Sequence, residues 1–205
     1  MNWYDRVILP WMIDIACGLP MVQSKRQSLV PLARGSVLEI GMGTGRNLPF
    51  YDRSRLTQLV GVDPALQMHS LAKRRSQQAG LSVELMGLSA EKLPVSDDSF
   101  DTVVCTYTLC SIPDPAAALH EVRRVLKPGG QFLFCEHGRA PDASVARWQD
   151  RLQPWWISLA GGCHLDRDVP LLLRDAGLHA QVQQGYVPGP RPLTYHYWGQ
   201  AHKTA

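Results

Sequence analysis

Short apolar runs alternate with longer amphipathic stretches along most of this chain. The runs have the length of β-strands, and some are apolar at consecutive positions, as at Val103, Val104 and Cys105. Such continuous runs are typical of strands that are covered on both faces. We predict strands at residues 36–40, 58–62, 82–86, 101–105 and 131–136, with extended segments at 178–184 and 195–202 that pair as an antiparallel edge.

The amphipathic stretches carry helix signals. Apolar residues have helical spacing in residues 65–78, and Gly80 ends this segment as a C-terminal glycine does. Residues 115–126 begin with a first-turn proline and precede a turn at 127–130, residues 166–176 end at a glycine, and a short helix is expected between the first two strands. This alternation predicts an α/β fold, with a doubly wound, mostly parallel seven-stranded sheet, helices on both faces and an antiparallel C-terminal edge strand.

Chain length and composition are those of one such domain. With 205 residues, of which 45% are hydrophobic, the chain can bury a continuous core. We expect this domain over residues 35–205, preceded by a helical N-terminal segment over residues 1–34. The longest early apolar run, residues 7–15, is interrupted by Pro10 and Asp14 and is shorter than the roughly 20 residues of a membrane span, so we expect membrane contact to be peripheral at most.

The charge and the cysteines limit which partners, metal sites and cellular locations we expect. The formal net charge of +3 comes from scattered Lys and Arg without a basic stripe interleaved with aromatic residues, so we expect no nucleic-acid partner. The 5 cysteines form no Cys-x-x-Cys pair and have no histidine at metal-ligand spacing. We therefore expect free thiols, no metal site and a reducing, cytoplasmic location.

Three glycines follow the first predicted strand directly. Gly41, Gly43 and Gly45 occupy alternate positions, where the backbone turns sharply and a ligand approaches it closely. Asp63 ends the second strand, where a carboxylate can accept hydrogen bonds from ribose hydroxyls; it can also cap the helix after Pro64, and the two roles are compatible. A dinucleotide dehydrogenase shares these features, but the third glycine of its Gly-x-Gly-x-x-Gly fingerprint is replaced here by Arg46.

With these features the sequence resembles the class I S-adenosylmethionine-dependent methyltransferases, in the branch that includes the ubiquinone and menaquinone C-methyltransferases. The matching blocks follow the family's order and spacing and cover roughly residues 35–137. They are residues 37–45, 61–64, 90–94, 97–106 and 126–130. The resemblance implies a Rossmann-like domain that binds S-adenosyl-L-methionine and releases S-adenosyl-L-homocysteine.

The resemblance also implies which residues bind the cofactor. The glycine loop would hold the methionine part, Asp63 the ribose, and Pro64 and Met68 the two sides of the adenine. Ser89 stands where many relatives have aspartate, so its side-chain contact to the adenine edge is expected to be weaker. Glu39 would support the loop or meet the ammonium group, and Thr106 would lie beside the methionine. The implied cofactor residues are Glu39, Gly41, Met42, Gly43, Gly45, Asp63, Pro64, Met68, Ser89, Ala90 and Thr106.

Looser matches concern the methyl acceptor. Residues 106–112, 136–137, 148–149 and 162–165 resemble the branch with the membrane-associated thiol S-methyltransferases and their bacterial relatives. The resemblance favours S-methylation of a small, apolar thiol. C- or O-methylation of a quinone precursor, phenol or lipid stays open, as does a cofactor-binding module without turnover.

A thiol acceptor needs little acid/base chemistry, but a positive or hydrogen-bonding neighbour raises its thiolate fraction. We predict His137, at the carboxyl end of the fifth strand, as that catalytic group; the alternative is a histidine that only packs there. His164 is the second candidate. Trp148, Trp155 and Trp156 either line an acceptor pocket or pack on the sheet. Substrate contacts are expected from Tyr4, Tyr107, Trp155 and His164.

The N-terminal segment has two interpretations. Residues 3–12 are aromatic and apolar with a few charges. In methyltransferases of this kind an N-terminal helix often covers the cofactor as a lid, which is the interpretation we favour here. The alternative is a helix on a membrane surface, which would favour lipid-like substrates. The protein is expected to be a monomer or a homodimer.

Overall fold

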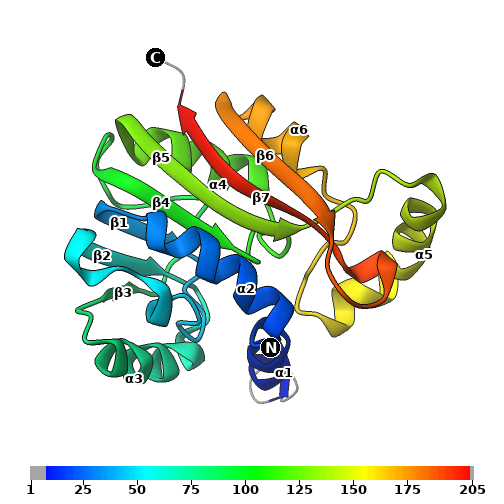
Figure 1. Cartoon of the computed structure of the whole chain (residues 1–205), viewed down its shortest axis with the longest axis horizontal. Coiled ribbons are helices and arrows are strands. Elements are labelled where there is room, and N and C mark those ends of the chain that lie inside the picture. Colours follow the sequence, from blue (N-terminus) through cyan, green and yellow to red (C-terminus); the bar gives the residue numbers. More distant parts are fainter. Residues whose placement is uncertain (1–7, 204–205) are drawn as a thin grey trace.

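The computed structural model describes residues 8–203, whose strands form one seven-stranded sheet (Figure 1). The strand order is β3-β2-β1-β4-β5-β7-β6, and only the β5–β7 and β7–β6 pairs are antiparallel. The predicted fold class is therefore confirmed. The strands are β1 Gly35–Ile40, β2 Leu56–Val62, β3 Glu84–Met86, β4 Phe100–Thr106, β5 Leu126–His137, β6 Leu178–Tyr186 and β7 Tyr195–Lys203.

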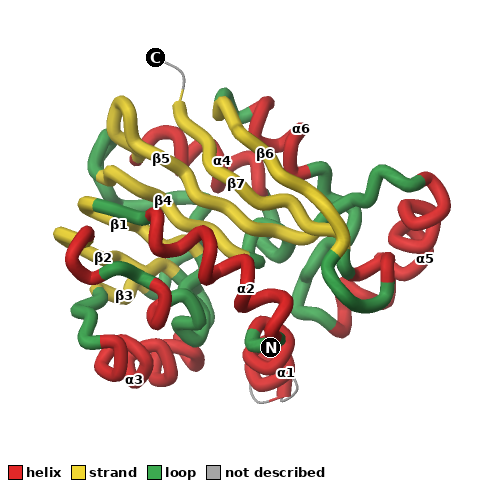
Figure 2. The backbone as a smooth tube through the Cα atoms, viewed as in Figure 1, coloured by secondary structure: helices red, strands yellow, loops and turns green. Residues whose placement is uncertain are grey.

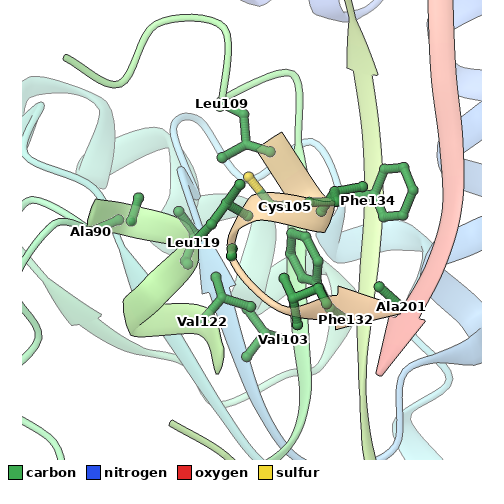
Figure 3. Close-up of a cluster of buried hydrophobic side chains, with 14 of the residues drawn as sticks. Ala90, Val103, Cys105, Leu109, Leu119, Val122, Phe132, Phe134 and Ala201 are labelled. Atoms are coloured by element: carbon green, nitrogen blue, oxygen red, sulfur yellow. The ribbon is translucent and has the colours of Figure 1, made fainter. Parts of the chain in front are cut away.

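Helices cover both faces of the sheet, and the two faces form separate cores. One core packs α4 and α6 on alternate strand residues such as Val103 and Cys105 (Figure 3), while the other packs α2 and α3 on the residues between them, such as Val104. This is why three consecutive apolar residues occur in β4. The helices are α1 Leu9–Cys17, α2 Pro20–Leu29, α3 His69–Ala79, α4 Pro115–Val125, α5 Ala143–Leu159 and α6 Val169–Asp175.

The bounds of several elements differ from the prediction. The helix expected at 65–78 begins only at His69, after a 3₁₀ turn, and ends as predicted at Gly80, whose φ of 65° is left-handed. In place of the short helix between β1 and β2 there are two 3₁₀ turns, Leu48–Phe50 and Arg53–Arg55. The turn expected at 127–130 lies inside β5, where the pairing with β4 shifts register.

Helix α5 was not predicted from the sequence. It contains Pro154, which normally breaks a helix, and much of its apolar surface faces solvent instead of the sheet. Trp148 is 54% exposed and Trp155 is 75% exposed, so neither packs on the sheet. Figure 2 shows this helix extending beyond the end of the sheet. Among the described residues, no helix is both long enough and apolar enough to cross a bilayer.

Candidate active site

A cavity of about 330 Å³ lies at the carboxyl ends of the central parallel strands. Its walls include the loop after β1, the segment after β2 and the turn after β4. The strand order reverses between β1 and β4, so the loops after these two strands diverge and leave a crevice. Position and size are those of a ligand pocket in an open α/β sheet.

The glycine loop forms the base of this cavity. Gly43 has a φ of 53°, and a Cβ added there would meet no atom closer than 3.7 Å, so the backbone is exposed to the cavity. Gly41 is crowded instead, because its Cβ would lie 2.0 Å from the Thr108 hydroxyl. The first glycine thus allows close packing against the turn after β4, while the second presents bare backbone to a ligand.

Asp63 is bound to this loop. One carboxylate oxygen accepts the Gly43 N–H and the other accepts the Ala65 N–H, each at 2.8 Å. The bond to Ala65 is a local capping contact, so the cap and the site role coexist. Burial raises the pKa of Asp63, which lines the cavity at 9% exposure. Each oxygen keeps a second lone pair, which suits a vicinal diol such as that of ribose.

Glu39 lies beneath the loop in a buried polar network. Its carboxylate accepts hydrogen bonds from Asn47 at 3.0 Å and from the Tyr51 hydroxyl at 2.7 Å. Burial raises its pKa to about 7, although these bonds act in the opposite direction. Of the two roles predicted for Glu39, these contacts correspond to support of the loop.

Arg26 is a cavity residue that sequence reasoning missed. It is only 4% exposed, donates to Asn47 at 2.6 Å and to Thr106, and lies 5.1 Å from the centre of the Tyr107 ring. Its Nε atom is buried and has no hydrogen-bond partner among the described residues. A guanidinium with an unused donor at a cavity is suited to a carboxylate ligand. No local motif identifies it, because it lies on α2, ahead of the recognisable blocks.

The N-terminal helix α1 is tied to the glycine loop through Asp14. This carboxylate accepts hydrogen bonds from Thr44, from Arg46 (Nε, 2.9 Å) and from Arg75 (Nη1, 2.8 Å). Burial opposes ionisation, but these bonds outweigh it and hold the pKa of Asp14 well below its usual range. Arg46 also lies against Gly18, where a Cβ would come within 2.8 Å of its guanidinium. The residue that replaces the dehydrogenase glycine thus holds α1.

Most of the predicted cofactor residues come together in the cavity. Two do not line it: Glu39, as described, and Gly45, where a Cβ would lie 2.6 Å from Leu48. The Ser89 hydroxyl donates to Glu91. The predicted residues that line the cavity are Gly41, Met42, Gly43, Asp63, Pro64, Met68, Ser89, Ala90 and Thr106.

The predicted acceptor residues are dispersed. Tyr107 lines the cavity, whereas Trp155 is exposed on α5 and His164 lies beside Asp166, 3.5 Å away. Tyr4 falls outside the described residues. His137 ends β5 as expected, but its Nε2 is 2.9 Å from the sulfur of Cys163, and His137 is not a cavity-lining residue. Burial lowers the pKa of His137, while contact with Cys163 outweighs this and raises it overall.

Comparison with known proteins identifies the enzyme family. A family model described as a methyltransferase domain matches residues 38–134. Thiol S-methyltransferase TMT1B of Rattus norvegicus is 37% identical over 175 residues, which cover 82% of this chain and 70% of the relative. The TMT1B of Homo sapiens is 34% identical over 197 residues, covering 89% and 80%.

Solved structures support the same fold. N-methyltransferase NodS from Bradyrhizobium japonicum, in complex with S-adenosyl-L-homocysteine, superposes with a TM-score of 0.69 at 17% identity, covering 96% of this chain and 93% of NodS. The YcgJ protein of Bacillus subtilis gives 0.67 at 21% identity, covering 90% and 98%. The chain therefore belongs to the class I S-adenosylmethionine-dependent methyltransferases, and S-adenosylmethionine is its cofactor.

Proposed function

We propose that this enzyme transfers the methyl group of its cofactor to the sulfur of a small, apolar thiol. The observation that carries the proposal is the similarity to thiol S-methyltransferases over most of the chain. The cavity wall formed by Ile112 and Pro113 is apolar and adjoins Tyr107, which suits a hydrophobic acceptor. The cofactor supplies a methyl group on a sulfonium; the acceptor sulfur gains that carbon, and S-adenosyl-L-homocysteine leaves.

The cavity residues have distinct roles in this reaction. Asp63 binds the ribose hydroxyls while it holds the Gly43 amide in place. Arg26, whose side chain lines the cavity, binds the methionine carboxylate. Holding the donor and the acceptor in line is the main contribution such a site makes, and the thiol proton passes to solvent before attack.

We further propose that α1 is a lid over the cofactor. Pro10, Ile13, Asp14 and Cys17 of this helix line the cavity, so the helix forms one wall of the site. Asp14 connects the helix to Thr44, Arg46 and Arg75, which belong to the glycine loop and to α3. The same carboxylate therefore holds both the lid and the glycine loop in place.

Transfer of a labelled methyl group tests the reaction. With the full chain and methyl-labelled cofactor, we expect label to appear on alkyl or aryl thiols and S-adenosyl-L-homocysteine to form in equal amount. A parallel panel of phenols and quinols should remain unlabelled. Label only on oxygen or carbon would contradict S-methylation. Cofactor binding without turnover on any acceptor would favour a binding module.

Asp63→Ala should raise the dissociation constant of S-adenosyl-L-homocysteine about tenfold or more, because charge-assisted hydrogen bonds worth roughly 1.5–3 kcal/mol are lost. Isothermal titration calorimetry measures the change. Asp52→Ala is the matched control, since Asp52 is exposed and only caps a 3₁₀ turn. Equal affinities of the wild type and Asp63→Ala would remove Asp63 from the ribose site.

Arg26→Gln should weaken S-adenosyl-L-homocysteine about tenfold or more, because it removes the charge facing the methionine carboxylate. Binding of 5′-methylthioadenosine should be nearly unchanged, since this ligand has the same nucleoside but no carboxylate. Calorimetry with both ligands on both proteins makes the comparison. If both ligands lose affinity equally, Arg26 supports the loop and does not bind the carboxylate.

Asp14→Asn should destabilise the protein at pH 7 by about 1–2 kcal/mol and weaken cofactor binding. The folded-state pKa of Asp14 is depressed, so its contribution is present above the unfolded value near 4 and is lost as pH falls below it. Urea unfolding should thus show a gap between variant and wild type that narrows toward pH 3. Asp175→Asn, in an exposed pair with Arg174, serves as control; a gap independent of pH would refute the role of the Asp14 charge.

A further inference from the structure

Two cysteines and a histidine lie close together at the turn after β4. The Sγ atoms of Cys110 and Cys163 and one ring nitrogen of His137 all lie within 4.8 Å of one another. Both cysteines are buried, at 4% and 9% exposure. The expectation that the cysteines bind no metal rested on their spacing along the chain, and the fold brings these three ligands together from distant segments.

The three side chains come from different elements that are fixed to each other. Cys110 lies in the turn after β4, His137 ends β5, and Cys163 follows α5 in a turn with two left-handed glycines. The backbone N–H of His164 donates to the carbonyl of Cys110 at 2.8 Å, so a hydrogen bond fixes the two cysteine-bearing turns to each other. Arg167 adds a second connection, because its Nη2 donates to the carbonyl of Ile112 at 2.6 Å. The site is therefore built before any ligand arrives.

The surroundings of the sulfur atoms resemble the outer shell of a metal thiolate. The indole N–H of Trp156 donates to the Cys163 sulfur at 3.3 Å. Outer N–H donors of this kind orient metal-bound sulfur and compensate its negative charge. Arg167 is bound to the carbonyls of Leu109 and Ile112, which hold the Cys110 turn. Two cysteine thiolates and one imidazole are a set of protein ligands typical of a catalytic zinc site.

We propose that Cys110, His137 and Cys163 bind one Zn²⁺ ion. In a tetrahedral zinc site with Zn–S near 2.3 Å and Zn–N near 2.0 Å, ligand atoms lie about 3.5–3.8 Å apart. To reach this geometry, the 2.9 Å separation between His137 Nε2 and Cys163 Sγ widens, and the two separations to Cys110 Sγ, which lie within 4.8 Å, adjust to the same range. Binding releases two protons from the cluster to solvent, so that both cysteines bind as thiolates and His137 binds as a neutral imidazole; the two thiolates balance the charge of the ion in its buried position.

The position of the ion indicates a structural role beside the cofactor cavity. Ser111, which follows Cys110, and Gly161, two residues before Cys163, line the cofactor cavity. The ion thus joins the turn after β4, the end of β5 and the turn after α5 into one rigid wall on this side of the cavity. Three protein ligands leave a fourth position for water or an exogenous ligand, as in catalytic zinc sites.

Metal content of the full chain tests the proposal without any methyl acceptor. The protein is purified with a non-thiol phosphine reductant and no chelator, loaded with Zn²⁺, desalted and measured by inductively coupled plasma mass spectrometry. We expect about one zinc per chain in the wild type, as a single Cys₂His site requires. Replacement by Co²⁺ should give the visible absorption of a tetrahedral ion with thiolate-to-metal charge transfer.

Variants locate the ion. Cys110→Ser, Cys163→Ser and His137→Ala should each lower the zinc content severalfold and remove or shift the cobalt bands. Cys17→Ser, on α1, is the matched control and should keep both signals. A cooperative thermal unfolding transition, followed by circular dichroism, checks that each variant is folded. A fully reduced wild type that takes up no zinc, or folded Cys110→Ser and Cys163→Ser proteins that retain it, would overturn the proposal. Because methyl transfer is not measured, this outcome is independent of the acceptor proposed above.

Discussion

The hydrogen bond between the Gly43 amide and the Asp63 carboxylate is the contact on which the site depends. Gly43 follows β1 and Asp63 follows β2, and these neighbouring parallel strands end together, with Ile40 paired with Val62. The sheet register therefore brings a glycine backbone and a carboxylate together although they lie 20 residues apart. Burial raises the pKa of Asp63, because the fold holds this charge where solvent stabilises it poorly.

A polar network beneath the loop keeps this arrangement rigid. Asn47 accepts a hydrogen bond from Arg26 and donates to Glu39 and Thr106, so it links a buried cation to a buried carboxylate without direct contact between them. Buried charged groups are costly when left without partners, so truncating one member exposes the others to that cost. Arg26 belongs both to this network and to the cavity lining, and its Nε has no hydrogen-bond partner among the described residues. The same network therefore supports the glycine loop and contributes a side chain to the cavity.

The rest of the cavity wall comes from segments outside the parallel strands. Helix α1 contributes through Asp14, the turn after β4 through Tyr107 and its neighbours, and the turn after α5 through Gly161. In the proposed binding mode the nucleoside end of the cofactor contacts the loops at the strand ends, whereas these segments surround the remainder. Methyltransferases that share this sheet can therefore differ in acceptor by changing only such segments. His137 lies behind this wall, where its ring contacts the sulfur of Cys163, and it does not line the cavity.

Sequence alone determined the sheet, the glycine loop and Asp63, because each depends on local periodicity or on short motifs in a set order. Apolar runs such as that in β4 indicate that the strand is buried on both faces. Glycines directly after a strand indicate a turn, and in the structure they adopt a left-handed φ. Only the tertiary structure revealed the contacts of Arg26 and Asp14 and the Cys110–His137–Cys163 cluster. These side chains contact residues from distant elements, so the contacts cannot be predicted from the spacing of the residues along the chain. Helix α5 also escaped prediction, since Pro154 and its solvent-facing tryptophans hide the helical pattern that burial normally reveals.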